Sequence, residues 1–405
     1  MFKKLSSLRA LLSANLSNLL IIVIIAIFLP LLYALYAVYN SNLEIKSLNS
    51  RLESLASEKN QYLSELQKTQ KELEDFSAQD QVKINQELAE EIKNIQKTYN
   101  SLVDTYESLL DLKEKTNKTK VLDETFAKAI SDLSKKDYES ATQKINELNK
   151  KIKEEETKLA SNLSIPTNVP QNNTPPASGY SRQQVNTDIG SFMVSLIAAD
   201  ISTTRVIVDT ASDSDCANNC PVLPLSTYVS RNGGFAGING TYFCPATYPS
   251  CANKTNSFDL LVMNKNKHYF NSSNNVYSNN PAVIFGNGYI RFVSSASQWG
   301  RDTSVDGVIS NYPLLLENGN IRFGGDDDPK KGSKGNRSFV ANKGNIVFIG
   351  VVHNATVVES ARVLKALGME NAMNLDSGGS TALWSGGYKV GPGRDIPNAI
   401  IFTRR

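Results

Sequence analysis

The sequence predicts an α+β globular C-terminal domain rich in β-sheet, preceded by a transmembrane helix and a helical coiled-coil stalk. Three observations support this architecture. Residues 19–39 carry no charge, and residues 41–160 contain neither glycine nor proline. Short β-type runs separated by turn signals begin from about Gln183. The 405 residues allow two or three units at roughly 100–200 residues per domain.

The uncharged segment Leu19–Tyr39 has the length of a membrane span. About 20 helical residues, at roughly 1.5 Å each, cross a hydrocarbon core of about 30 Å. Positive charges precede it at Lys3, Lys4 and Arg9, and positive charge stays on the cytoplasmic side. A cleaved signal peptide would have a shorter apolar core and a small-x-small site, which we do not find. We therefore expect residues 1–18 in the cytoplasm and a single-pass plasma-membrane anchor, with the remaining chain outside.

Residues 41–160 show the apolar spacing of a helical stalk. Steps of four and three recur from Ile45 to Phe76, which is a heptad seam. A second run extends from Ile84 to Leu109, and the register slips around Ser77–Asp80. A helical hairpin is expected to complete the segment. The pattern fits a spacer that dimerises the protein or an antiparallel bundle folded on itself, and neither interpretation assigns chemistry to the stalk.

The segment that follows is expected to be a disordered linker over residues 161–185. Its first 22 residues contain four prolines and many Asn, Thr and Ser side chains, which cannot bury a core. It marks the boundary with a globular domain over residues 186–405. In that domain a capping box at Thr356 and Glu359 and a C-terminal Gly368 predict one helix.

Charge and cysteine usage limit the function classes. A formal net charge of +3 gives no basis for a nucleic-acid partner. The four cysteines could form a zinc site, but C-x3-C followed by C-x6-C lacks the paired knuckles of a zinc ribbon. An oxidising compartment favours disulfides instead. Three pairings are open, and the simplest is two local loops, Cys216–Cys220 and Cys244–Cys251.

Three segments of the C-terminal half concentrate groups that can do chemistry. In GINGTYF, Asn239 presents an amide beside two aromatics, or forms a simple hairpin turn. In GNRSFVA, Arg337 can grip a phosphate through parallel hydrogen bonds, or lie on the surface. In NLDSGGST, Asp376 can act as base, nucleophile or metal ligand, and Gly378 and Gly379 let a ligand approach the backbone. Alternatively, this last segment is a tight turn capped by Asp376.

Taken together and in this order, the segments resemble the phosphodiester glycosidase family over residues 186–405. ISNYPLLLENGNI and GRDIPNAIIF resemble the family's middle hairpin and closing strand. The resemblance implies an enzyme that hydrolyses a sugar attached through its anomeric oxygen to phosphate, with cleavage of the bond between the anomeric carbon and that oxygen. Ser377 departs from the family's triple glycine, where a positive φ would strain a serine.

The resemblance also implies roles for individual residues. The expected catalytic residues are Asp376, Arg337 and Asn239. The expected substrate-binding residues are Gly240, Tyr242, Phe243, Ser377, Gly378, Gly379, Ser380, Thr381 and Arg394. Arg337 and the glycine-loop N–H groups would hold the phosphate, and Asp376 would activate water or attack the anomeric carbon.

The expected partners are a glycan or sugar-phosphate substrate, the membrane through residues 19–39, and a second copy of the chain through the stalk. The substrate is expected among envelope glycans or polysaccharides. No cofactor is indicated with certainty, and a divalent metal is left open. Two other functions also fit an anchored stalk: a non-catalytic module that binds envelope polysaccharide, and a coiled-coil scaffold.

Overall fold

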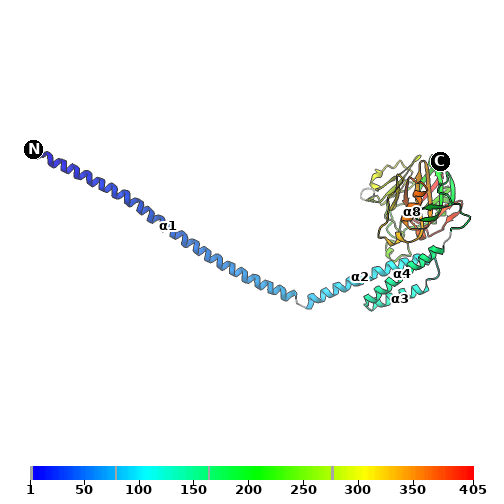
Figure 1. Cartoon of the computed structure of the whole chain (residues 1–405), viewed down its shortest axis with the longest axis horizontal. Helices are drawn as coiled ribbons and strands as arrows, with labels where there is room; N and C mark the ends of the chain where they lie inside the picture. Colours follow the sequence, from blue (N-terminus) through cyan, green and yellow to red (C-terminus); the bar gives the residue numbers. More distant parts are fainter. Residues whose placement is uncertain (1–2, 78–79, 163–164, 275–277) are drawn as a thin grey trace. The chain divides into compact units, whose positions relative to one another are not determined.

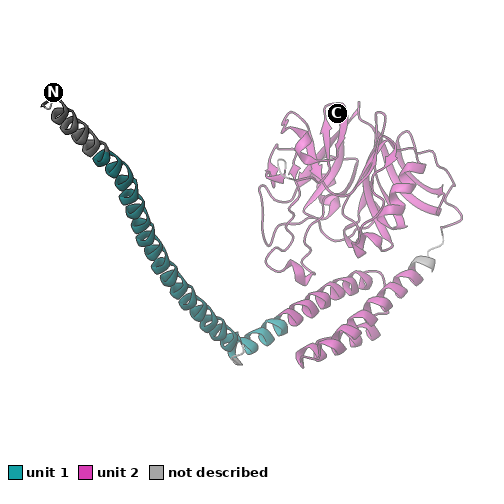
Figure 2. Cartoon of the chain, turned by 60° about the vertical axis from the view of Figure 1, so that its left-hand side comes forward, with its two compact units in different colours: residues 1–92 teal, residues 93–405 magenta. Residues whose placement is uncertain are grey.

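The computed structural model describes residues 3–77, 80–162, 165–274 and 278–405. The chain divides into two compact units, residues 1–92 and residues 93–405 (Figure 2). The first unit is helical, and the second contains a helical bundle and a domain of three antiparallel β-sheets.

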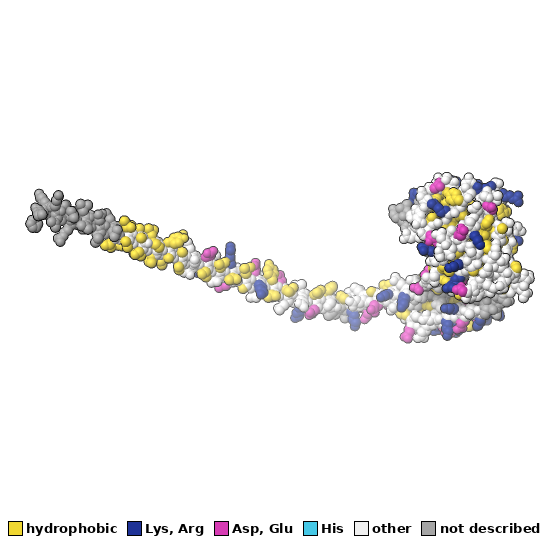
Figure 3. Space-filling view, turned by 45° about the horizontal axis from the view of Figure 1, so that its top comes forward, with side chains coloured by type: hydrophobic (Ala, Val, Ile, Leu, Met, Phe, Trp, Pro, Cys, Tyr) yellow, Lys and Arg dark blue, Asp and Glu magenta, His cyan; other side chains and the backbone are white. Residues whose placement is uncertain are grey.

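The first unit is built on one long helix. α1 (Lys3–Ser77) runs without a break through the expected membrane segment and the first heptad run, with Pro30 inside it. By length and composition it is the one helix in the described part of the chain that could cross a membrane. Apolar side chains cover the N-terminal segment of α1 that is expected to span the membrane. Charged side chains appear on α1 beyond that segment (Figure 3). The expected register slip includes residues 78–79, which lie outside the described residues, and α2 (Asp80–Lys113) begins after them.

The helices that begin the second unit form a small bundle. The C-terminal part of α2 packs against α3 (Lys120–Ser134) and α4 (Tyr138–Asn162) (Figure 1). Its apolar interior contains Leu109, Leu112, Leu122, Leu148 and Ile152. The bundle interpretation therefore describes this part of the expected stalk, whereas the heptad seam of α1 stays exposed, as at Leu52 and Leu66.

Seven strands form the largest sheet, in the order β1-β2-β13-β12-β14-β10-β11. Their bounds are β1 (Gly179–Thr187), β2 (Gly190–Asp200), β10 (Leu314–Glu317), β11 (Asn320–Ile321), β12 (Gly335–Lys343), β13 (Ile346–Ala355) and β14 (Asn371–Asn374). Because β14 lies between β12 and β10, the chain that leaves its end starts from the interior of the sheet.

Two five-stranded sheets complete the domain. One has the order β16-β15-β4-β17-β3, with β3 (Thr204–Thr210), β4 (Ala236–Asn239), β15 (Leu383–Ser385), β16 (Tyr388–Val390) and β17 (Asn398–Arg404). The other has the order β6-β5-β9-β7-β8, with β5 (Val262–Met263), β6 (Tyr269–Phe270), β7 (Ala282–Gly286), β8 (Tyr289–Val293) and β9 (Gly307–Ser310). The antiparallel, β-rich domain confirms the predicted fold class.

The main hydrophobic core lies where the three sheets face one another. It joins side chains from all of them, including Val208, Ile238, Phe285, Val340 and Phe402. Burial of such side chains contributes roughly 1.5–3 kcal/mol each, so this core fixes the relative placement of the sheets.

Helices cover the outer faces of two sheets. α8 (Val357–Ala366) packs on the seven-stranded sheet through a second core that includes Leu364 and Phe339 (Figure 1). The predicted capping box at Thr356 and Glu359 is present, and Gly368 follows the helix with a φ of +72°. α5 (Leu225–Arg231) covers the sheet that contains β17.

The expected disordered linker needs a correction, because β1 begins at Gly179, inside residues 161–185. The preceding segment is also held to β1: the Asn172 N–H donates to the Gln184 carbonyl over 2.9 Å. The Gln183 side-chain amide donates to the Asn172 carbonyl over 2.6 Å. A segment too polar to bury a core is thus ordered by hydrogen bonds along a sheet edge.

Both disulfides close local loops. Cys216 pairs with Cys220 and Cys244 pairs with Cys251, which is the simplest of the three pairings and excludes a zinc site at these thiols. The second loop ends in the short η1 (Pro249–Cys251) and presents Tyr248 and Ser250 to the helical bundle.

Replacing Gly350→Ala should destabilise the domain by about 1–3 kcal/mol, because a Cβ there would lie 2.7 Å from the Phe339 ring and 2.7 Å from the Ser195 carbonyl oxygen. Gly335→Ala is the matched control in the neighbouring strand, since its Cβ would meet nothing within 4 Å. Chemical denaturation should show a change within about 0.5 kcal/mol for the control. Equal midpoints for the two variants would contradict the packing argument.

Candidate active site

The loop after β14 forms the centre of the candidate site. The Leu375 N–H donates to the Ser338 carbonyl and the Asp376 N–H donates to the Gly240 carbonyl, each over 2.9 Å. A short helical turn, η3 (Gly378–Ser380), follows. Ser377 has an extended backbone with a φ of −138°, and the positive φ of +65° falls on Gly378. The serine at this position therefore causes no strain, because the glycine takes the left-handed conformation.

Asn239 supports this loop from the interior of the domain, on the side away from the pocket. Its side chain is completely buried. The amide nitrogen donates to the Asp376 carbonyl over 2.6 Å, and the amide oxygen accepts from the Ser338 hydroxyl and the Ala382 N–H. With these bonds made, Asn239 positions the Asp376 loop and does not face the pocket. β4 lies between β15 and β17, so Asn239 is not part of a hairpin turn.

A pocket of about 260 Å³ opens above the loop. Nine of the twelve expected site residues line it: Arg337, Asp376, Tyr242, Phe243, Ser377, Gly378, Gly379, Ser380 and Arg394. The other three are Asn239, Gly240 and Thr381. Gly240 sits against Asn398, whose side-chain oxygen would lie 1.9 Å from an added Cβ, and the Thr381 hydroxyl donates to the Asn336 carbonyl. Gly240 and Thr381 therefore pack or bond beside the pocket and do not line it.

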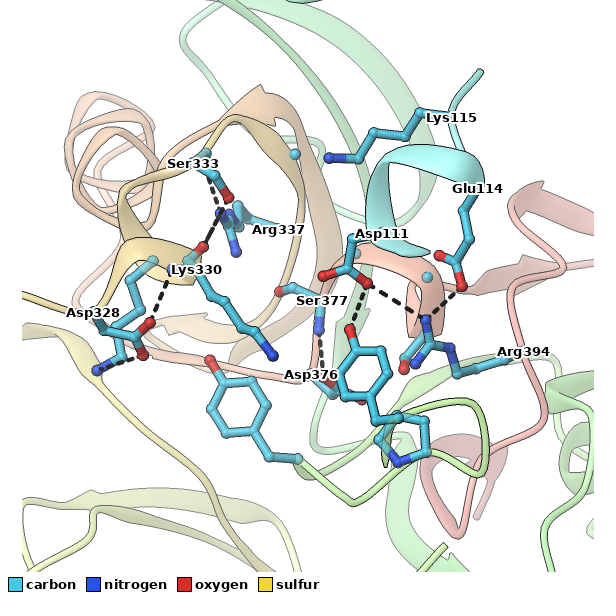
Figure 4. A pocket seen from close by; sticks show the side chains of 18 of the residues that line it. Asp111, Glu114, Lys115, Asp328, Lys330, Ser333, Arg337, Asp376, Ser377 and Arg394 are labelled. Carbon is cyan, nitrogen blue, oxygen red and sulfur yellow. Dashed lines mark hydrogen bonds and ion pairs between the residues drawn. The ribbon is translucent and has the colours of Figure 1, made fainter. Parts of the chain in front are cut away.

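Arg337 is a buried cation held by backbone oxygens. Only 7% of the residue is exposed. Its Nε donates to the Ala355 carbonyl over 3.0 Å, and its Nη2 donates to the carbonyls of Lys330 and Ser333 (Figure 4). Burial lowers the pKa of Arg337, yet an arginine stays charged at neutral pH. Within the described part of the chain no carboxylate forms an ion pair with it, so its charge is available to an anion.

Asp376 carries the strongly perturbed carboxyl group of the pocket. Burial raises its pKa from 3.8 to about 6, whereas hydrogen bonds from Ser380 and from the Ser377 N–H, together with the charge of Arg394, oppose that rise. The residue keeps some exposure toward the pocket. A carboxyl group that changes charge close to neutral pH is suited to take up a proton during a reaction.

Helix α2 supplies a wall of the pocket that the sequence did not predict. Asp111 and Glu114 line it, and Glu114 forms an ion pair with Arg394 over 2.6 Å (Figure 4). The Tyr248 hydroxyl donates to Asp111. The stalk was expected to carry no chemistry, and the end of α2 nevertheless lines the candidate site. The spacing of Glu107, Asp111 and Glu114 by four and three residues was the available signal, because it places three carboxylates on one helix face.

Lysines also surround the pocket, and each has a carboxylate partner. Lys330 and Lys331 belong to the short α7 (Pro329–Gly332), and Lys334 follows it. Lys330 pairs with Glu107 over 3.2 Å, and Lys334 pairs with Glu359 over 2.5 Å. Lys331 pairs with the acidic loop at Asp326 and Asp328. One lysine of this group is thus shared by two carboxylates of the acidic loop.

The described residues contain no evident metal site, and neither described histidine lines the pocket. Among them, no group of three His, Cys, Asp or Glu side chains is arranged to hold a metal ion, and dependence on a divalent metal stays open. His353 lies away from the pocket and bonds to Ser195 and Asn336. Burial lowers its pKa to about 4, which keeps the ring neutral in a structural role.

Comparison with known proteins supports the resemblance. Residues 232–403 match the family model for phosphodiester glycosidases. No curated protein matches the sequence significantly. Among solved structures, a hypothetical protein from Synechocystis is 16% identical, with a TM-score of 0.44, and the match covers 56% of this chain and 62% of that one. The zebrafish N-acetylglucosamine-1-phosphodiester α-N-acetylglucosaminidase catalytic domain, auto-inhibited by its pro-peptide, is 16% identical, with a TM-score of 0.44, and the match covers 58% of this chain and 87% of that one.

Replacing Asp376→Asn should stabilise the protein above pH 6. Below about pH 4 the carboxyl is protonated in both the folded and unfolded states, so the variant gains nothing. As the pH rises from about 4 to 6, the unfolded state loses the proton first, and the wild type loses stability on the order of 2 kcal/mol. Thermal unfolding of both proteins from pH 4 to 8 measures the gap. A gap that is constant over this range would contradict the raised pKa.

Proposed function

We propose that the C-terminal domain, whose residues 232–403 match the phosphodiester glycosidase model, is a hydrolase that cleaves glycosyl-1-phosphodiester bonds. One observation carries the proposal. A perturbed carboxyl at Asp376 and a buried, carboxylate-free cation at Arg337 line the same pocket as the glycine turn Gly378–Gly379. These groups supply a proton acceptor and an anion site within one cavity.

The chemistry follows from where charge develops. Water attacks the anomeric carbon, and the bond from that carbon to the phosphate oxygen breaks. The sugar leaves with a new hydroxyl and the phosphate becomes a monoester. Asp376 takes the proton from the attacking water. Negative charge grows on the departing phosphate, where Arg337 and the N–H groups of the glycine turn stabilise the transition state more than the substrate.

The remaining pocket residues suit a sugar. Phe243 and Tyr242 give an apolar surface on which a sugar ring can rest. The hydroxyl of Tyr242 bonds to Asn374, and burial raises its pKa, so this tyrosine stays neutral. Arg394 sits on the far side of Asp376 from Arg337 in the view of Figure 4, and its positive charge lowers the pKa of Asp376.

We also propose that α1 anchors this enzyme in the plasma membrane, with the N-terminus cytoplasmic and the C-terminal domain extracytoplasmic. The apolar segment of α1, the positive charges that precede it and the two disulfides support this placement. A substrate in envelope glycans or polysaccharides fits an anchored enzyme. The exposed heptad seam of α1 supports dimerisation of the stalk.

The activity test uses the full chain in detergent with a glycosyl-1-phosphodiester such as a hexose 1-(methyl phosphate). Asp376→Asn should lower kcat/KM by about 10²–10⁴-fold, because the proton acceptor is lost. Asp188→Asn is the control, since this carboxylate pairs with Arg362 outside the pocket and its loss should leave turnover unchanged. Retention of glycan without product, unaffected by Asp376→Asn, would instead support a binding module.

The pH profile should identify Asp376 by its neighbours. With the base deprotonated above its pKa, kcat/KM should fall below about pH 6. Arg394→Gln should move this limb to higher pH, because Arg394 lowers the pKa of Asp376. Asp111→Asn should move it to lower pH, because Asp111 raises that pKa. Movement of the two variants in the same direction would remove Asp376 as the titrating group.

A further inference from the structure

The acidic face of α2 is turned toward the pocket and the disulfide loop beside it. Glu107 accepts from the Ser250 N–H over 3.1 Å and pairs with Lys330. Asp111 accepts from the Tyr248 hydroxyl, and Glu114 pairs with Arg394. Every carboxylate of this face therefore has a partner in the globular domain, and the face is part of the binding site.

Negative charge exceeds positive charge on this wall. Glu114 lies 2.6 Å and Asp111 lies 3.9 Å from the same Nη2 of Arg394. One guanidinium cannot neutralise two carboxylates, and the partner of Asp111 on its other side, Tyr248, is uncharged. Asp376 adds a further negative charge above its pKa of about 6. A cation or a strong hydrogen-bond donor is the complement of this surface.

On the opposite wall, Arg337 is the cation without a carboxylate partner among the described residues. The lysines of that wall are each paired with a carboxylate, as described above. Arg337 is bonded only to neutral carbonyl oxygens among the described residues. Its complement is an anion. The pocket therefore has two walls of opposite charge in one cavity of about 260 Å³: one suited to an anion and one suited to a cation.

We propose that the substrate of this pocket is zwitterionic: a glycosyl-1-phosphodiester that also carries a protonated amine, with its phosphate toward Arg337 and its ammonium toward Asp111 and Glu114. The inference rests on the proposed function and narrows it to a substrate class. The amine belongs either to an amino sugar or to an amino-alcohol esterified to the phosphate. The cavity lies below the range of roughly 300–1,000 Å³ for small-molecule sites, so both charges belong to a compact group.

The same charges exclude other substrates. A second anionic group near the phosphate would face Asp111 and Glu114, and like charges brought together at an interface are strongly unfavourable. A neutral amide in place of the amine loses the charge-assisted hydrogen bonds to these carboxylates. Removing the amine charge by N-acetylation is thus the smallest change that tests the inference.

Two matched substrate pairs distinguish the sources of the amine. The first is glucosamine 1-(methyl phosphate) and its N-acetyl derivative. The second is glucose 1-(aminoethyl phosphate) and its N-acetyl derivative. With the full chain in detergent at pH 7, the free amine of one pair should have a kcat/KM about tenfold or more above that of its acetylated partner.

Variants assign the preference to α2. The double variant Asp111→Asn/Glu114→Gln should reduce the ratio between amine and amide to near one. Glu317→Gln should leave it unchanged, because Glu317 pairs with Arg322 over 3.0 Å outside the pocket and matches the Glu114–Arg394 pair in type. The preference should also disappear above the pKa of the substrate amine, a change that a purely structural role of α2 would not produce.

Each outcome decides one of the two proposals. Equal turnover within both pairs overturns the zwitterion inference and leaves the hydrolase intact. A uniform rise for all substrates in the double variant, with the ratio unchanged, shows that α2 obstructs the pocket and also overturns it. Turnover of none of the four overturns the hydrolase. Calorimetry on the wild type then decides the inference: about tenfold tighter binding of an amine than of its amide supports it, and equal or absent binding overturns it.

Discussion

The buried side chain of Asn239 is the contact on which the candidate site depends. It joins the end of β4 to the Asp376 carbonyl, to Ser338 in β12 and to Ala382 ahead of β15. These segments come from two different sheets and are separated by up to 143 residues in the chain. A buried amide with an unmade hydrogen bond costs about 1–3 kcal/mol, so the three segments are held together as a unit. The position of the Asp376 carboxyl is thus set by contacts in the domain interior.

This constraint explains why the two charged groups of the pocket can stay poorly neutralised. A desolvated guanidinium at Arg337 and a carboxyl with a raised pKa at Asp376 both oppose folding. Rigid antiparallel strands on either side, with fully buried residues such as Phe339 and Val340, hold them in place against that cost. The two groups therefore keep charges that ions of opposite sign could neutralise.

Much of the architecture could be predicted from local signals. Alternating apolar runs marked strands such as β8, and the capping box marked α8, because these features depend only on nearby residues. The three motifs were recognised as chemistry-bearing by residue type and order. The sequence could not distinguish residues that face the pocket from those that support it, because Asn239 and Asp376 both follow or end buried strands. Only the strand order shows that Asn239 lies behind the loop.

The contribution of α2 was missed for a different reason. Neither interpretation of the stalk assigned a role to its carboxylates, because helical periodicity identifies the apolar face of a bundle and does not show what the polar face contacts. Their partners lie in the loop closed by Cys244 and Cys251, far along the chain. That loop carries little apolar surface of its own, and a disulfide is the means by which a short irregular segment is kept in one conformation. The loop closed by Cys244 and Cys251 and the acidic face of α2 therefore act together, because their contacts hold the end of α2 at the edge of the pocket.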